Sequence, residues 1–138
     1  EYTDYFFPSY EEASYLSGLK KPKEIAHFFA DRGALHVGVK VGGDGCYLLT
    51  KEYEGLIPSF QTPVLDTTGA GDNFMAGLIH GILSGWDLAD SVTYANAAGA
   101  RAVSRLGATD EGEYKETINH ILMQTPEGER LVKEAIRE

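Results

Sequence analysis

The sequence has 138 residues, of which 43% are hydrophobic and 24% charged, and its formal net charge at pH 7 is -9. This length suits one compact domain or about half of a larger one, and the ordinary apolar fraction argues against disorder. The 21 acidic residues outnumber the 12 basic ones. This balance argues against nucleic acid and anionic membranes as partners, because both would repel the surface. A small anionic ligand held by backbone N–H groups is still compatible with it.

Cysteine content and the ends of the chain give further expectations. The single cysteine, Cys46, cannot form an internal disulfide, so we expect a reducing, cytoplasmic location. The sequence contains no run of about 18 apolar residues and no secretory signal pattern, so no membrane association is expected. The chain starts at Glu1 without a methionine, and we interpret it as a fragment or a processed form.

The N-terminal part predicts a strand followed by two helices. Residues 2–7 are aromatic and strand-like and end at a proline. Ser9 is a candidate N-cap, and Glu12 follows three residues later, as in a capping box. This helix should run to about residue 17 and end at Gly18. A second helix should begin near Pro22 and extend to residue 33.

A valine-rich segment at 35–41 predicts the next strand, and glycines at 42, 43 and 45 then interrupt the chain. Residues 46–50 and 53–57 predict two more short strands. A helix should follow Gly71 with an apolar face that comprises Met75, Leu78, Ile79, Ile82 and Trp86. Asp87 should cap a further helix that reaches about residue 105, and short helices at 113–123 and 126–137 should end the chain. This order predicts an α/β fold whose later helices pack together.

The segment before the apolar helix carries the chemistry. Gly69, Ala70 and Gly71 precede a helix start, where free N–H groups and the helix dipole favour an anion such as phosphate. Asp72 lies in the first turn, where a carboxylate can accept a proton from an alcohol while the amides hold a phosphoryl group. A plain turn with Asp72 as a helix cap is the alternative interpretation.

Neither common nucleotide motif is present in this segment. A P-loop requires Gly-Lys-Ser/Thr, but Asp72 follows Gly71, and Phe74 stands where a dinucleotide fingerprint has its third glycine. An oxidoreductase with a dinucleotide-binding sheet is therefore disfavoured. The four histidines show no ligand spacing, and no Ser-His-Asp order or zinc pattern predicts hydrolysis.

Several longer motifs carry a family resemblance. They are Asp66-Thr67-Thr68-Gly69-Ala70-Gly71-Asp72-Asn73-Phe74-Met75-Ala76-Gly77, then Tyr94-Ala95-Asn96-Ala97-Ala98-Gly99-Ala100, then Arg105-Leu106-Gly107-Ala108, with Gly42-Gly43-Asp44-Gly45 upstream. Together they resemble the ribokinase family of sugar kinases, the PfkB-type carbohydrate kinases, over residues 7–108.

The resemblance implies a ribokinase-like three-layer α/β/α fold of which this chain is a part. Residues 1–138 would be the C-terminal, nucleotide-side portion of a single kinase domain whose N-terminal sugar-binding half and lid are absent. The implied activity is ATP-dependent phosphorylation of a hydroxyl of a carbohydrate or a related small alcohol. A nucleotide-binding or regulatory domain without kinase activity is the alternative. The implied partners are ATP, a small sugar and the missing half, and a homodimer of the full protein is left open.

The resemblance also assigns roles to the glycine-rich segment and to the nucleotide side. It makes Asp72 the catalytic base and gives Gly69, Ala70 and Gly71 the anion hole for the γ-phosphate of ATP. It assigns the nucleotide contacts to four residues, which are Lys40, Gly42, Gly45 and Asn96. Taken alone, the 42–45 segment is better explained by a hairpin turn, and Asn96 is equally well explained as a capped or solvated helix asparagine.

Metal binding is implied at two places. Ser9 and Glu12 resemble an Asn-x-x-Glu element that organises Mg²⁺ and phosphate through water, with serine in place of asparagine. A simple capping box is the competing interpretation of Glu12. A monovalent cation such as K⁺ would be held at positions that match the family's cation site, namely Asp66, Thr68 and the backbone around Ala102, Arg105 and Gly107.

Overall fold

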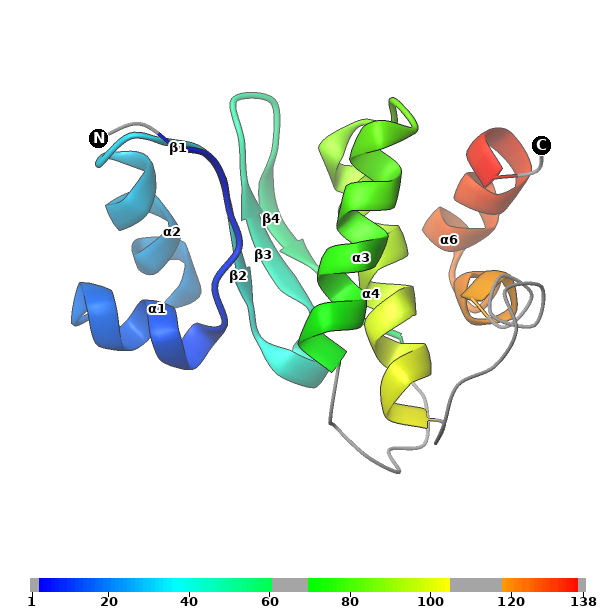
Figure 1. Cartoon of the computed structure of the whole chain (residues 1–138), viewed down its shortest axis with the longest axis horizontal. Helices are drawn as coiled ribbons and strands as arrows, with labels where there is room; N and C mark the ends of the chain where they lie inside the picture. The colour runs from blue at the N-terminus through cyan, green and yellow to red at the C-terminus, as the bar shows by residue number, and fades with distance from the viewer. Residues whose placement is uncertain (1–2, 61–69, 105–117, 137–138) are drawn as a thin grey trace. The chain divides into compact units, whose positions relative to one another are not determined.

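The computed structural model describes residues 3–60, 70–104 and 118–136. The chain divides into two compact units, Glu1–Pro58 and Ser59–Glu138, and each is described by itself. Figure 1 shows strands and two helices in the first unit and only helices in the labelled elements of the second. The expected mixture of strands and helices, with helix after helix at the end, is therefore confirmed in the described residues.

The first unit is built on a four-stranded sheet. Its strands are β1 (Thr3–Phe6), β2 (Ala34–Lys40), β3 (Cys46–Leu49) and β4 (Glu54–Ile57). They are ordered β1-β2-β3-β4, with β1 parallel to β2 and the other two pairs antiparallel. Because β1 and β2 are parallel, their carboxyl ends meet at the same edge of the sheet.

Helices α1 (Tyr10–Ser17) and α2 (Pro22–Ala30) follow β1 and lie on one side of the sheet (Figure 1). The predicted bounds of α1 are confirmed, because Ser9 is its N-cap and Gly18 closes it at φ 74°. Helix α2 begins at Pro22 as predicted but ends three residues before Gly33. Gly33 instead closes the following turn at φ 108°, a left-handed value that glycine adopts without strain.

The core of the first unit lies between these helices and the sheet. Five fully buried residues form its centre, and they are Ala13, Ile25, Ala26, Val37 and Val39. Gly38 of β2 lies directly beneath the ring of Phe7, so a side chain at this position would collide with the ring. The valine-rich pattern of residues 35–41 therefore marks an inner strand that is packed against α2.

The second unit is a set of packed helices. Helix α3 (Ala70–Leu83) runs antiparallel to α4 (Leu88–Ser104), and residues 118–122, α6 (Pro126–Leu131) and a π-helical turn, η2 (Val132–Ile136), follow. Asp87 caps α4 as predicted, since its Oδ1 accepts a hydrogen bond from the Asp90 backbone N–H at 2.8 Å. The first part of the helix predicted at 113–123 lies outside the described residues.

The predicted apolar face of α3 is right for Leu78 and wrong for Ile79, while Met75, Ile82 and Trp86 are half-buried. The helix buries Phe74, Gly77, Leu78 and Gly81, whereas Ile79 is 51% exposed. Glycines let α4 come so close that its backbone covers this side of α3. A count of large apolar side chains misses such a face, because close approach rather than side-chain bulk creates the burial.

Within the described parts of the chain, no helix combines the length and the apolar character that crossing a membrane requires.

Candidate functional site

The first turn of α3 holds three of the predicted site residues. The helix begins at Ala70, and Gly71 and Asp72 follow in its first turn, both exposed to solvent. The first N–H groups of an α-helix have no carbonyl partner within the helix, so this turn can bind an anion. An exposed carboxylate beside such amides can reach a small ligand. Gly69, the remaining member of the predicted anion hole, lies outside the described residues.

Helix α4 packs against this first turn of α3. A Cβ atom built on Gly99 would lie 3.5 Å from the carbonyl oxygen of Ala70 and 3.8 Å from the Cβ atom of Phe74. Further along, a Cβ atom on Gly77 would lie only 3.0 Å from the Cα atom of Ala95. The position of Asp72 within the second unit is therefore set by how α3 packs on α4.

Residues 42–45 connect the antiparallel strands β2 and β3, so the hairpin-turn interpretation describes their structure. A 3₁₀ turn, η1 (Gly42–Asp44), is closed by a hydrogen bond of 3.2 Å from the Gly45 N–H to the Gly42 carbonyl. Gly42 has φ 59° and Gly45 has φ 118°, values that favour glycine. Among the described residues, no heavy atom lies within 4 Å of a Cβ atom built on Gly42. A nucleotide role for this turn stays a prediction.

Ser9 and Glu12 form the capping box that their spacing predicts. The Ser9 N–H donates to Glu12 Oε1 at 3.2 Å, the Ser9 hydroxyl donates to the same atom at 3.0 Å, and the Glu12 N–H donates to Ser9 Oγ at 3.3 Å. These bonds to Ser9 lower the pKa of Glu12, and the positive charge of Lys40 adds a smaller effect. The carboxylate is therefore kept ionised at the start of α1.

The structure brings Lys40 to the same place. Ser9 and Lys40 form a parallel bridge, and the Lys40 N–H donates to the Pro8 carbonyl at 3.0 Å. This juxtaposition was not predicted, although the signal was present in the chain order. Ser9 follows β1 and Lys40 is the last residue of β2, so both lie at the carboxyl ends of neighbouring parallel strands, which is the edge where α/β sheets bind ligands. Three predicted nucleotide-side features, the serine, Glu12 and Lys40, thus share one edge of the sheet.

The remaining predicted residues are only partly described. Asn96 lies in the middle of α4 and is 4% exposed, so the simple picture of a solvated asparagine is wrong, and its role near adenine stays a prediction. Of the predicted monovalent cation site, only Ala102 is described, in the last turns of α4. Its other members lie outside the described residues, and they are Asp66, Thr68, Arg105 and Gly107. In the described ranges, no three His, Cys, Asp or Glu side chains gather as a metal site.

The amino-acid sequence matches the model of one known protein family. The model of the family described as "pfkB family carbohydrate kinase" matches residues 1–114. The chain belongs to this family. Its membership confirms the ribokinase-like resemblance of the glycine-rich segment and the flanking motifs.

Individual pfkB family members and ribokinase-like structures agree. The 2-dehydro-3-deoxygluconokinase of Bacillus subtilis is 41% identical over 108 residues, which are 78% of this chain and 33% of that protein. The aminoimidazole riboside kinase of Salmonella enterica, solved with aminoimidazole riboside and an ATP analogue, superposes with a TM-score of 0.73 at 31% identity, covering 83% of this chain and 42% of that one. A provisionally named ribokinase II of Escherichia coli, in complex with ATP and Mg²⁺, has a TM-score of 0.73 at 31% identity, covering 86% and 40%.

These matches establish the ribokinase-like α/β fold for the chain. They also show what share of its relatives' length the chain spans. The chain spans about a third of the curated relative and about two fifths of each of these two structures.

Proposed function

We propose that this chain is the C-terminal, nucleotide-side portion of an ATP-dependent carbohydrate kinase, which transfers the γ-phosphate of ATP to a hydroxyl of a sugar or a related small alcohol. The proposal takes residues 1–138 as part of a single kinase domain whose sugar-binding half is a separate stretch of the same protein.

The observation that carries the proposal is the first turn of α3. This turn places the Asp72 carboxylate beside the N–H groups of a helix start, and α4 holds the turn from behind. Phosphoryl transfer needs little covalent chemistry from the protein, because positioning and electrostatic stabilisation supply most of the catalysis. A carboxylate and a set of amides at one helix start provide both.

In this mechanism, Asp72 takes the proton of the acceptor hydroxyl as the hydroxyl oxygen attacks the γ-phosphorus. The bond from phosphorus to the new oxygen forms while the bond to the bridging oxygen of ADP breaks, and ADP leaves. The N–H groups of Gly69, Ala70 and Gly71 stabilise the negative charge that spreads over the transferring phosphoryl oxygens.

The nucleotide contacts in this proposal follow from the family resemblance. The glycines at 42 and 45 let the nucleotide lie against the backbone, Lys40 contributes positive charge, and Asn96 contacts the base. Mg²⁺, when bound, neutralises phosphate charge, and the ionised carboxylate of Glu12 fits this ion because Mg²⁺ prefers carboxylates and retains several waters.

The direct test uses the complete protein, since the acceptor side is outside this chain. The protein is incubated with Mg-ATP and a panel of aldoses, ribosides and 2-dehydro-3-deoxy sugar acids, and ADP and new phosphate esters are measured. The proposal predicts that at least one acceptor yields ADP and a phosphate monoester in equal amounts. ATP binding without acceptor-dependent turnover on the whole panel would instead support a regulatory domain that lacks kinase activity.

A further inference from the structure

Residues 118–136 follow the part of the chain that the family model matches, which ends at residue 114. They nevertheless pack tightly on α4. A buried apolar cluster joins them to this helix, and it comprises Phe60, Tyr94, Ala97, Ala98, Ala100, Ile118, Ile121, Leu122 and Leu131. Gly128 also lets α6 approach the backbone of Leu122, because a Cβ atom at this position would collide with the Leu122 carbonyl group. The segment is therefore a fitted part of the second unit.

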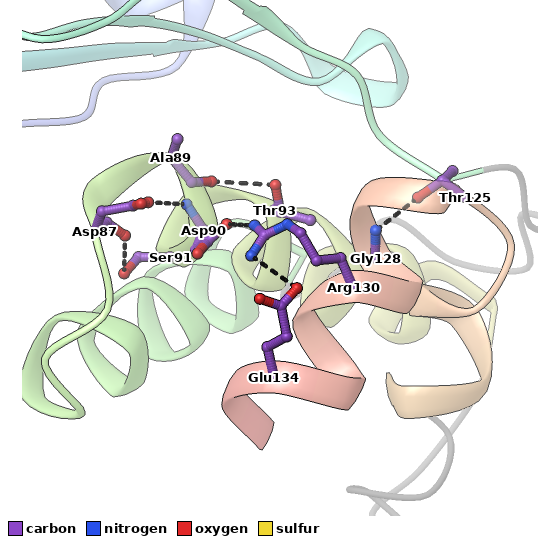
Figure 2. A network of polar contacts seen from close by, with 9 residues as sticks. All are labelled: Asp87, Ala89, Asp90, Ser91, Thr93, Thr125, Gly128, Arg130 and Glu134. Carbon is purple, nitrogen blue, oxygen red and sulfur yellow. Dashed lines mark hydrogen bonds and ion pairs between the residues drawn. The ribbon is translucent and has the colours of Figure 1, made fainter. Parts of the chain in front are cut away.

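One charged contact anchors the segment to the start of α4. The guanidinium group of Arg130 on α6 donates to the Asp90 carboxylate on α4, as Figure 2 shows. The side chain of Asp90 is 18% exposed and that of Arg130 is 47% exposed. The Glu134 carboxylate lies 3.8 Å from the same guanidinium group, one turn further along the segment.

The surroundings of Asp90 make it dependent on this partner. Burial raises the pKa of Asp90, the nearby negative charge of Asp87 raises it further, and Arg130 opposes both effects. A carboxylate that is partly buried beside another carboxylate is destabilised when its cation is removed. The ion pair between Arg130 and Asp90 therefore helps to hold α6 against α4.

Helix α4 is packed on two sides by different elements. Its Ala98 belongs to the cluster with the C-terminal segment, yet its Cβ atom would lie only 3.1 Å from a Cβ atom on Gly77 of α3. The backbone of Ala95 and Gly99 also lies against α3. Because packed interiors contain few voids, a displacement of α4 on one side is transmitted to the helix on the other side. That helix carries Asp72 in its first turn.

We propose that residues 118–136 form a clasp that fixes α4 against α3, and that Arg130 is a positioning residue which keeps Asp72 in place through this packing. The functional half of this inference rests on the proposed phosphoryl transfer. The docking half rests only on the contacts of Arg130 and the buried cluster.

The test compares two variants of the complete protein that each remove one positive charge from the segment. Arg130→Gln breaks the contact with α4. Lys133→Gln is the matched control, because the Lys133 ammonium group lies 3.1 Å from Glu129 Oε1 and this ion pair stays within the segment. Arg130→Lys is the conservative variant, which retains the charge. Hydrogen exchange of the amides at 88–104 and 118–136 measures docking, and kcat and the dissociation constant of ADP measure positioning.

The clasp predicts that Arg130→Gln speeds exchange in both ranges roughly 5- to 30-fold, the ratio expected for a loss of one or two kcal/mol. Lys133→Gln should leave these rates near those of the wild type, and Arg130→Lys should restore most of the protection. We also expect kcat to fall at least about fivefold in Arg130→Gln alone, with a smaller change in ADP affinity.

Three results would overturn parts of this inference separately. Equal exchange in the Arg130→Gln and Lys133→Gln proteins would remove the clasp. Faster exchange with unchanged kcat would remove the positioning role and leave a purely structural contact. A wild-type protein without turnover would refute the proposed function, and with it the positioning role, while the exchange comparison would still decide the docking.

Discussion

Gly77 of α3 faces Ala95 of α4 with so little space that a Cβ atom at Gly77 would lie 3.0 Å from the Ala95 Cα atom. This separation is tighter than nine in ten real Cβ contacts, so α4 would have to shift by a few tenths of an ångström, and its backbone cannot turn aside as a flexible side chain could. The spacing of the two helices, and with it the place of Asp72 at the start of α3, therefore depends on the missing side chain of Gly77, together with that of Gly81.

We predict that Gly77→Ala lowers the free energy of unfolding of the complete protein. Overpacking a core typically costs about 1–3 kcal/mol, whereas replacing a glycine by alanine within a helix gains about 1 kcal/mol. The net loss of stability therefore ranges from near zero to about 2 kcal/mol. Gly99→Ala is the matched control, since its Cβ atom would meet Ala70 and Phe74 at ordinary contact distances. It should be neutral or stabilising in denaturant titrations. Equal effects of both substitutions would contradict the close approach of α3 and α4.

A second prediction concerns acid stability of the first unit. Glu54 Oε2 accepts a hydrogen bond of 2.8 Å from the Tyr47 hydroxyl and lies 2.8 Å from His27 Nε2. The bond from Tyr47, followed by that to His27, lowers the pKa of Glu54. A lowered folded-state pKa contributes stability above the unfolded pKa, about 4.3, and this contribution is lost as the pH falls through the folded value.

Tyr47→Phe removes the larger of these two effects and keeps the ring. We expect the variant to be less stable than the wild type at neutral pH and to approach it as the pH falls through the lowered pKa of Glu54, below which Glu54 is protonated in both proteins. Tyr15→Phe, at an 87% exposed position on α1, is the control. Unfolding free energies from pH 7 downward provide the measurement, and a constant difference between the wild type and Tyr47→Phe would refute the assignment.

The ionisation of the Tyr47 hydroxyl gives a further prediction at high pH. Burial, with a smaller contribution from Glu54, raises the pKa of Tyr47 to about 12. A raised pKa contributes stability that is present below the unfolded value, about 10, and is lost as the pH rises through the folded one. Absorbance titration of the wild type against Tyr47→Phe should therefore reveal one tyrosine that ionises late. Identical titration curves, scaled for the one missing tyrosine, would contradict this.

A fourth prediction separates the two interpretations of Glu12. Glu12→Gln retains a side chain that a capping box accepts, so the free energy of unfolding should change by less than about 0.5 kcal/mol. The negative charge is lost, and the Mg²⁺ concentration for half-maximal kinase activity should rise roughly tenfold if the carboxylate helps to hold the ion through water. Glu11→Gln, in the same exposed first turn, is the control. An unchanged Mg²⁺ requirement would leave Glu12 with the capping role alone.

Local signals explain why the sequence predicts α1 so well. Ser9 and Glu12 satisfy each other's backbone donors and Gly18 adopts a left-handed conformation, and all of these requirements are encoded within ten residues. The signals that predict Asp87 as a helix cap and a helix start near Gly71 are similarly local. The glycine turn at 42–45 was also readable from its composition, although its two interpretations, hairpin and nucleotide turn, describe the same backbone and only a bound ligand separates them.

Features that depend on distant partners were harder to predict. The buried face of α3 was predicted only in part, because Gly77 and Gly81 are buried by the backbone of α4 and offer no apolar side chain to count. The meeting of Ser9 with Lys40 requires that β1 and β2 pair in parallel, which residues 31 positions apart do not indicate by themselves. The contact between Arg130 and Asp90 joins two helices across 40 positions, and no local pattern announces it.

The central claim of the account is that Asp72 is the base in phosphoryl transfer, and Asp72→Asn in the complete protein tests it most directly. The substitution retains size and much of the capping ability but cannot take a proton, so kcat should fall about 10²–10⁴-fold. The dissociation constant of ATP should change far less, because the proposed anion site consists of backbone N–H groups. A helix-cap role alone predicts the opposite pattern, with up to about 2 kcal/mol of stability lost and nearly normal turnover. A folded Asp72→Asn protein with near wild-type kcat would contradict the account.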